Sequence, residues 1–326
     1  MFRKILLGLL GLVVLVIAAG AAFVASRQHL KFDAPFPPVV ASTDTAVIAR
    51  GHYIVRDVAN CTQCHGDPTQ HDAIVAGADV PLSGGFTFDI PPGSFHVRNI
   101  TPDDETGIGR FPDGAIARAL RNGIGHDGRA LLPFMEMQGL SDEDLVAVVS
   151  YLRTQPPVHH LVPAHSYNLL GAIVKATILA NPVGPSQRPP KTSPRGATVE
   201  NGRYLVESVG LCWACHTQRD EKTGALTGPR FGGSTEFKES GDPTHIWAPP
   251  NITSDPATGR LGKMTEDDFV NRFHGGRLIE HSPMPWQGFS RMSEDDLRAM
   301  YKYLKSLPPV SRDVGPPVRE VAANAK

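Results

Sequence analysis

Asn60-Cys-Thr-Gln-Cys-His-Gly66 and Leu211-Cys-Trp-Ala-Cys-His-Thr217 share one pattern, and together they contain all four cysteines of the 326-residue chain. Two residues between the cysteines place both sulfurs on one helical turn, where they can reach the two vinyl groups of a single haem. The histidine that follows then lies beneath the iron as an axial ligand. Because this Cys-x-x-Cys-His pattern is the attachment signature of c-type haem, we predict two covalently bound haems. Their binding residues are Cys61, Cys64 and His65 in the first motif and Cys212, Cys215 and His216 in the second.

Three other uses of these cysteines fit the sequence less well. A four-cysteine zinc site normally separates its two pairs by about 15 to 20 residues, whereas Cys64 and Cys212 are 148 positions apart. A thioredoxin-like redox pair needs a βαβ context, which these Gly- and Pro-rich surroundings do not offer. Two structural disulfides would suit an oxidising compartment, but they would leave the repeated histidine unexplained.

The two motifs belong to a longer internal repeat. Asn99-Ile-Thr-Pro-Asp103 returns as Asn251-Ile-Thr-Ser-Asp255, and Ser141-Asp-Glu-Asp-Leu145 returns as Ser293-Glu-Asp-Asp-Leu297. From the motif histidine to the asparagine the distance is 34 residues in the first copy and 35 in the second. This shared order predicts two duplicated domains, residues 42–156 and 197–310, with a linker at 157–196 and a tail at 311–326.

Each copy is predicted to open and to close with a helix. The opening helices, one of them over residues 45–60, hold a glycine (Gly51 or Gly202) that allows another helix to cross closely. The closing helices begin at Ser141 and Ser293, whose side chains can cap the first turn. The third residue after each serine is an aspartate that can complete a capping box. These acidic clusters therefore mark helix starts favoured by the helix dipole, rather than catalytic carboxylates.

The N-terminal segment has the length of a membrane span. Residues 5–24 are uncharged and apolar or small, and they follow Arg3 and Lys4. Twenty such residues match a hydrocarbon core of about 30 Å, whereas a cleaved signal peptide usually has an apolar run of about 7 to 15 residues. Ala19-Gly20-Ala21 is a weak cleavage site, so a removed signal is the alternative. We predict a retained anchor within residues 1–30 and a location outside the cytoplasm for the rest of the chain.

The composition limits the remaining classes. The chain has 32 basic and 33 acidic residues, which excludes a generally basic nucleic-acid binder, so no nucleic-acid partner is expected. Its 32 glycines and 29 prolines predict long ordered loops and few strands. Within the linker, residues 168–180 form an apolar stretch that is too short to span a bilayer. We predict a helix packed on a domain there, with membrane contact as the alternative.

The chain resembles the class I c-type cytochromes, specifically membrane-anchored di-haem proteins such as the cytochrome subunits that serve bacterial alcohol, aldehyde and sugar-acid dehydrogenases. The resemblance covers residues 46–310 and is carried by the two haem motifs, the Asn-Ile-Thr segments and the Ser-acidic-Leu closing helices. It implies an all-α fold in two tandem domains after a transmembrane helix, with a haem as the core of each domain. Better-known members often carry three such domains, whereas this sequence has two.

The resemblance also implies that a methionine in a Pro-rich loop, just before the last helix, binds the distal face of each haem. In the second copy the match is Met284, within Ser282-Pro-Met-Pro-Trp286, and the nearby His281 is the alternative. In the first copy Met135 is the better match and Met137 is the alternative. His/Met coordination raises the haem potential, and it fills both axial positions, which favours electron transfer over catalysis.

Weaker candidates surround the motifs. Gly84-Gly85 and Gly232-Gly233 could let the backbone approach a porphyrin or could simply form turns. Asn99 and Asn251 could hydrogen-bond haem propionates, although asparagine is also typical of turns.

Together these patterns predict an electron carrier rather than an enzyme. It would pass single electrons on the outer, periplasmic face of a bacterial inner membrane, between a dehydrogenase or quinol pool and a respiratory acceptor. The expected partners are a dehydrogenase subunit and a quinone or terminal oxidase system. The alternative is a di-haem peroxidase with one open haem iron, and the methionines available in both copies argue against it.

Overall fold

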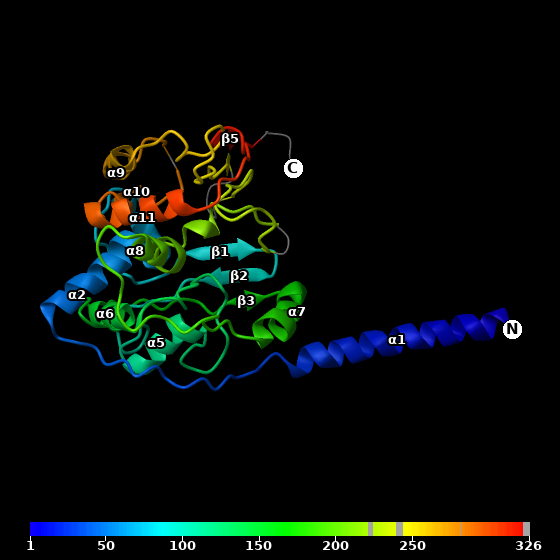
Figure 1. Cartoon of the computed structure of the whole chain (residues 1–326). Coiled ribbons are helices and arrows are strands. Elements are labelled where there is room, and N and C mark those ends of the chain that lie inside the picture. The colour runs from blue at the N-terminus through cyan, green and yellow to red at the C-terminus, as the bar shows by residue number, and fades with distance from the viewer. Residues whose placement is uncertain (221–223, 239–243, 281, 322–326) are drawn as a thin grey trace.

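The computed structural model describes residues 1–220, 224–238, 244–280 and 282–321. One long helix, α1 (Phe2–Ser26), projects from a body that contains every other element (Figure 1). With η denoting a 3-10 or π-helical turn, these elements are α2 (Thr45–His52), η1 (Tyr53–Val58), α3 (Thr62–His65), η2 (Pro68–Gln70), α4 (His71–Val75), β1 (Thr87–Ile90), β2 (Gly93–His96), α5 (Asp113–Asn122), α6 (Asp142–Arg153), β3 (Ser166–Tyr167), α7 (Leu169–Thr177), η3 (Ile178–Ala180), α8 (Val199–Tyr204), η4 (Leu205–Val209), η5 (Cys212–Ala214), β4 (His245–Trp247), α9 (Glu266–His274), α10 (Trp286–Phe289), α11 (Glu294–Ser306) and β5 (Val318–Glu320).

A pair of crossed helices frames each repeat: α2 packs on α6 in the first, and α8 packs on α11 in the second. Gly51 and Gly202 lie at the two crossings. A Cβ atom at Gly51 would overlap the carbonyl oxygen of Ala147, and one at Gly202 would overlap that of Ala299. The prediction that these glycines allow close helix crossing is therefore confirmed.

Five short strands among the described residues correct the expectation of an all-α fold. β1, β2 and β3 form an antiparallel sheet in that order, and β4 pairs with β5. β3 belongs to the segment that follows the first repeat, and β5 belongs to the tail that follows the second. In both cases the chain leaves a repeat, turns back and adds one strand to it, because an extended segment satisfies its backbone groups by pairing with another.

The two repeats share one core. A single cluster of buried apolar side chains includes Val55 and Leu145 from the first repeat and Val206 and Leu297 from the second. The body is therefore one continuous packed unit that contains both haem motifs.

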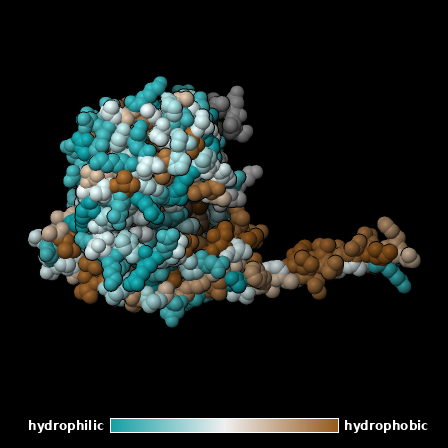
Figure 2. Space-filling model, in the orientation of Figure 1, coloured by the Kyte–Doolittle hydropathy of each residue, from teal (hydrophilic) through white to brown (hydrophobic). Residues whose placement is uncertain are grey.

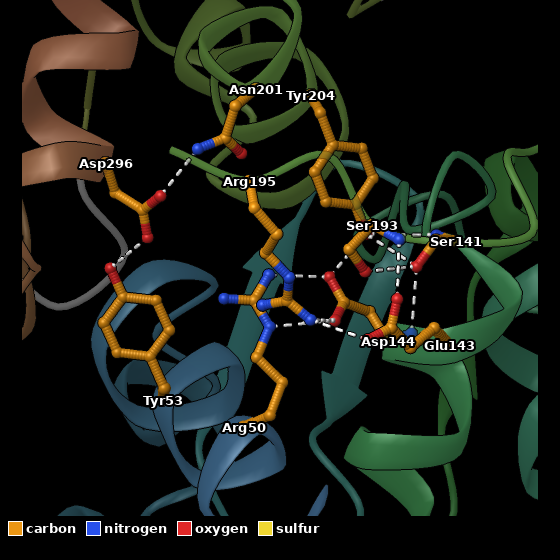
Figure 3. A network of polar contacts seen from close by, with 10 residues as sticks. All are labelled: Arg50, Tyr53, Ser141, Glu143, Asp144, Ser193, Arg195, Asn201, Tyr204 and Asp296. Carbon is orange, nitrogen blue, oxygen red and sulfur yellow. Dashed lines mark hydrogen bonds and ion pairs between the residues drawn. The ribbon is translucent and has the colours of Figure 1, made fainter. Parts of the chain in front are cut away.

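Two tyrosines exchange contacts between the repeats (Figure 3). The hydroxyl of Tyr53, at the end of the first repeat's opening helix, donates to Asp296 at 2.7 Å. The hydroxyl of Tyr204, at the matching place in the second repeat, donates to Asp144 at 2.8 Å. Because Asp144 and Asp296 lie in the first turns of α6 and α11, each repeat's opening helix contacts the start of the other repeat's closing helix.

The closing helices begin as predicted, but their aspartates have a different role. The hydroxyls of Ser141 and Ser293 accept hydrogen bonds from the third residue of the helix, at 2.9 and 3.2 Å, so both N-caps are confirmed. The expected reciprocal capping box is absent from both helices. Asp144 instead forms a two-pronged ion pair with Arg50, both contacts 2.9 Å long. The sequence could not reveal this partner, because α2 reaches α6 only in the tertiary structure.

Candidate functional site

A π-helical turn leads into each Cys-x-x-Cys-His motif. η1 precedes the first motif and η4 precedes the second, and a residue in the left-handed region then turns the chain: Asn60 at φ +52° and Leu211 at φ +47°. Such a conformation is uncommon for residues other than glycine and marks a site whose surroundings impose it. The turn carries the chain into a short helical segment that holds the cysteines.

Each motif forms one helical turn. The amide of His65 donates to the carbonyl of Cys61 at 2.8 Å, and the amide of His216 donates to the carbonyl of Cys212 at 3.0 Å. The first cysteine and the histidine therefore lie on the same face, one turn apart. This is the arrangement that a haem attached through both cysteines and bound by the histidine requires.

The histidines are oriented as metal ligands. Nδ1 of His65 lies 2.8 Å from the carbonyl oxygen of Arg98, and Nδ1 of His216 lies 2.8 Å from that of Pro250. Because a carbonyl only accepts, Nδ1 carries the proton and Nε2 presents its lone pair. Burial lowers the pKa of both imidazoles and outweighs the opposing effect of these bonds, so each ring is neutral near neutral pH. A metal-ligating histidine is typically held by such a bond, and the side chains present fit a haem iron at both motifs.

The first cysteine of each motif is partly buried. Burial raises the pKa of Cys61 and of Cys212 to about 12 in each case, so each free thiol keeps its proton near neutral pH. No group of three or more His, Cys, Asp or Glu side chains that could hold a metal ion occurs among the described residues. This absence of an assembled donor set argues against the zinc alternative.

Glycines bring the carbonyl-bearing segments close to the histidines. The amide of Gly84 donates to the carbonyl of His65 at 2.8 Å, and that of Gly233 donates to the carbonyl of His216 at 2.9 Å. Both glycines have positive φ, and a Cβ atom on Gly84 or on Gly233 would collide with the backbone of Arg98 or of Asn251. Gly84 therefore corresponds to Gly233. These glycines allow backbone to approach backbone, which positions the carbonyl that holds each histidine.

The asparagine of each Asn-Ile-Thr segment hydrogen-bonds its own turn and the chain that follows the closing helix. The side-chain oxygen of Asn99 accepts from the amide and the hydroxyl of Thr101, at 2.9 and 2.7 Å, while its Nδ2 donates to the carbonyl of Val158 at 2.8 Å. Asn251 repeats this pattern with Thr253 and Val310. Since both asparagines are buried and bonded within the protein, the turn interpretation is confirmed. The propionate interpretation stays a prediction.

The predicted methionine ligands differ in their surroundings. Met284, in the loop before α10, and Met137, just before α6, pack against the shared core. Met135 instead lines a small depression with Ala119, Leu131 and other residues. The alternative ligand His281 lies outside the described residues.

The methionine loop of each repeat contacts the motif region of the other repeat. Nε2 of Gln63, inside the first motif, donates to the carbonyl of Pro283 at 3.0 Å, next to Met284. Conversely, Gly139, two residues after Met137, lies against the side chain of Ser208 in η4. The two candidate sites are therefore neighbours.

An ion pair also joins the two repeats near the loop that contains Met284. Nε of Arg291, just after α10, lies 2.7 Å from the carboxylate of Asp57 in η1. Burial raises the pKa of Asp57 and outweighs the opposing effect of Arg291. This pair attaches the segment after Met284 to the helix that leads into the first motif.

Sequence reasoning missed three kinds of group: two tyrosines, one glutamine and two backbone carbonyls. The sequence did mark Tyr53 and Tyr204, since each stands two residues after a glycine at matching places in the repeats. Gln63 had none, because Ala214 stands at its place in the second motif. The histidine-binding carbonyls of Arg98 and Pro250 belong to the backbone, so side-chain identity carries no information about them.

The chain is similar in sequence to known cytochromes c. Residues 199–308 match the family model described as Cytochrome c. The chain is 33% identical over 286 residues to the alcohol dehydrogenase (quinone), cytochrome c subunit, of Gluconobacter oxydans, with 82% of this chain covered. It is 29% identical over 288 residues to the gluconate 2-dehydrogenase cytochrome c subunit of Pantoea cypripedii, with 80% covered. The resemblance predicted from the motifs is therefore confirmed.

The relatives differ in length from this chain. It spans 56% of the alcohol dehydrogenase subunit and 60% of the gluconate dehydrogenase subunit. By contrast, it spans 96% of a diheme cytochrome c-type protein of Cereibacter sphaeroides, to which it is 27% identical with 91% of this chain covered. The names of these relatives describe cytochromes rather than catalytic subunits, in agreement with the predicted electron carrier.

Proposed function

We propose that this chain, which contains a cytochrome c domain and is homologous to the cytochrome c subunits of a quinone alcohol dehydrogenase and a gluconate dehydrogenase, is a di-haem electron-transfer subunit. Residues 42–156 and 197–310 would be two tandem class I cytochrome c domains, joined by residues 157–196 and followed by a tail at 311–326. The observation that carries this proposal is the pair of motif histidines, each held through Nδ1 by a backbone carbonyl at 2.8 Å.

The family model matches the second domain, and the internal repeat supports the first. Crossed helices with a glycine at the contact, a π-helical turn before the motif and a buried, hydrogen-bonded asparagine all occur in both halves. A duplicated framework of this kind favours a duplicated cofactor site. A cytochrome c domain implies covalently bound haem, and the diheme relative supports a count of two.

The chain's own residues would hold each haem from both sides. Cys61 and Cys64 in the first domain, and Cys212 and Cys215 in the second, would form the thioethers. His65 and His216 would ligate iron through Nε2. Bound in this way, haem supplies one-electron chemistry by alternating between its ferrous and ferric states.

A methionine would complete the coordination of each haem iron and exclude other ligands. In the second domain we propose Met284, which is supported by its packing against the core in the loop before α10. In the first domain the candidates are Met135, favoured by the sequence match, and Met137, favoured by its packing against the core. Thioether ligation would leave no open position for a peroxide substrate, and it raises the haem potential.

α1 would attach this carrier to a membrane. It is the one described helix that is long and apolar enough to cross a bilayer, and none of its residues is buried against the body. We place the haem domains on the periplasmic side of a bacterial inner membrane. There the carrier would take electrons from a dehydrogenase or quinol pool and pass them to a terminal oxidase system.

Mass spectrometry of the purified chain tests the cofactor count. We expect two haem additions that survive acid-acetone extraction, and we expect one in each of the double variants Cys61→Ala/Cys64→Ala and Cys212→Ala/Cys215→Ala. Carbon monoxide should leave the spectrum of the reduced wild-type protein unchanged, because both irons are closed. One haem in the wild type would refute the di-haem proposal, and carbon monoxide binding would favour the peroxidase alternative.

A further inference from the structure

The helix α7 has an unusual distribution of side chains. Its buried positions are the small residues Gly171 and Ala176, whereas Leu169 is 79% exposed and Ile173 is 42% exposed. Just beyond the helix, Ile178 is 59% exposed. An ordinary surface helix buries its large apolar side chains against the core, so this arrangement is reversed. The sequence-based prediction of a helix packed on a domain is confirmed for the small face only.

α7 is joined to the end of α1. Nε of Arg27, one residue after α1, donates to the carbonyl of Ala176 at 2.7 Å. Nε2 of Gln28 donates to the carbonyl of Ala172 at 2.9 Å. Two bonds to the backbone of α7 therefore fix its position relative to the last turn of α1 (Figure 1).

This connection determines the depth of α7 if α1 crosses a membrane. A helix of 25 residues is about 37 Å long at about 1.5 Å per residue, against a hydrocarbon core of about 30 Å. Its C-terminal end then emerges in the interfacial layer, and α7, bonded to that end, lies at the same level. Figure 2 shows hydrophobic surface that continues from the base of α1 onto the adjoining part of the body.

The residues around the patch suit a lipid surface. Lys175 lies on α7 with its ammonium 4.8 Å from the ring centre of Tyr167, and Arg27 and Lys31 follow α1. From residue 156 to residue 195 the chain contains basic residues and no acidic ones. Cations attract anionic headgroups, and tyrosine is enriched at membrane interfaces.

We propose that α7 is a membrane-surface contact: Leu169, Ile173 and Ile178 enter the headgroup region beside the anchor, while Lys175 faces the anionic headgroups. This inference rests on the proposed membrane attachment through α1. An apolar face in this position, beside a transmembrane helix, is typical of interfacial helices. α7 would hold the haem domains in one orientation against the membrane, since a single flexible attachment would let them rotate.

Site-directed spin labelling of the full-length protein in vesicles of phosphatidylcholine and phosphatidylglycerol tests this proposal. The native cysteines are consumed by haem attachment, so an introduced cysteine takes the label alone. The protein is kept in the ferric state, because reductants of the haems would also reduce the nitroxide. A nitroxide at Ile173→Cys should show a ratio of oxygen to nickel-chelate accessibility several-fold higher than one at Leu278→Cys. Leu278 is a matched control, because it is apolar and 71% exposed and follows α9 in the chain. Figure 1 shows α9 and α10 on the side of the body away from α1.

A label at Val14→Cys, in the middle of α1, separates the possible failures. If Val14 lies in lipid and Ile173 lies in water, the surface contact is wrong and the anchor stands. That result would leave a partner subunit as the occupant of the patch. If Val14 is in water, the anchor is wrong, and the surface contact fails with it. If more than one label binds per chain, native cysteines are free and a haem is not attached. That result would contradict the proposed di-haem function without bearing on the surface contact.

Discussion

Gln63, between the two cysteines of the first motif, donates a hydrogen bond from its side chain to the backbone carbonyl of Pro283, the residue before Met284. Asn60 lies within 3.5 Å of the carbonyl of Pro285, on the other side of that methionine. The loop proposed to ligate the second iron is therefore held from both sides by the first motif. On the proposed assignment, attachment of one haem and ligation of the other would be structurally linked.

Replacing Gln63 tests this link. Gln63→Ala removes a neutral hydrogen bond worth about 1 kcal/mol, so the Met284-ligated fraction of the second haem should fall several-fold relative to the open form under mild denaturant. The measurement is the weak near-infrared band of thioether-ligated ferric haem. Gln70→Ala is the matched control, because Gln70 bonds Asp67 within the first repeat. An equal response of the two variants would show that the contact has no effect on ligation.

The same band identifies the methionines. Met284→Ala should remove about half of it, because each of two His/Met sites contributes a similar band. Met135→Ala and Met137→Ala are then compared, and the variant that removes the other half identifies the ligand of the first site. If Met284→Ala leaves the band at full strength, the choice of ligand in the second repeat is wrong.

The helix crossings predict a matched pair of destabilised variants. Gly51→Ala and Gly202→Ala each force a methyl group against a carbonyl of the crossing helix, so each should lower the free energy of unfolding by about 1–3 kcal/mol. Urea unfolding monitored by circular dichroism measures the loss. Gly184→Ala, where the nearest atom would be 3.7 Å away, should stay within about 0.5 kcal/mol of the wild type. Similar losses in all three would remove the steric explanation.

The Asp144–Arg50 pair predicts a dependence of stability on pH. Burial by itself would raise the pKa of Asp144, but Arg50 and Tyr204 outweigh burial and lower it. The stabilisation is therefore complete above the unfolded-state pKa of about 3.9, and it is lost as the pH falls through the lower folded-state pKa. Asp144→Asn leaves a largely buried cation unpaired and should cost about 3–5 kcal/mol at pH 7. In urea titrations at several pH values, this variant should lose less additional stability in acid than the wild type.

Asp296→Asn is the control for that series. Asp296 accepts hydrogen bonds from the neutral groups of Asn201 and Tyr53, so its substitution leaves no comparable cation unpaired. It should therefore cost less at pH 7 than Asp144→Asn. A larger loss from Asp296→Asn would show that the ion pair does not dominate at the first helix start.

Features that occur in both repeats were predictable from the sequence. Gly51 with Gly202, and Ser141 with Ser293, could be recognised because each observation was made twice at matched spacing. The strands β3 and β5 were not predictable, since each is only two or three residues long and forms by pairing with a distant segment.

Contacts between the repeats were equally hidden from sequence reasoning. The side chain of Gln63 finds its acceptor 220 positions away, and no local pattern encodes such a distance. The aspartate Asp144 was assigned to a helix start correctly, but its main partner depends on how α2 crosses α6. Local chemistry was therefore predictable, whereas partners brought together by packing were not.

The hydrogen bonds of Tyr53 and Tyr204 are reciprocal, because the tyrosine of each repeat donates to an aspartate of the other. Reciprocal contacts of this kind are typical of an isologous interface. Two identical subunits related by a dyad would form the same pair of bonds. The geometry is thus that of a homodimer whose subunits have been fused into one chain. In a single chain the two halves can differ in sequence. Arg50 bonds Asp144 in the first repeat, whereas Asn201 bonds Asp296 in the second. Such an arrangement would give the two proposed haem sites different environments, and hence a direction to electron transfer, which a symmetric dimer cannot have.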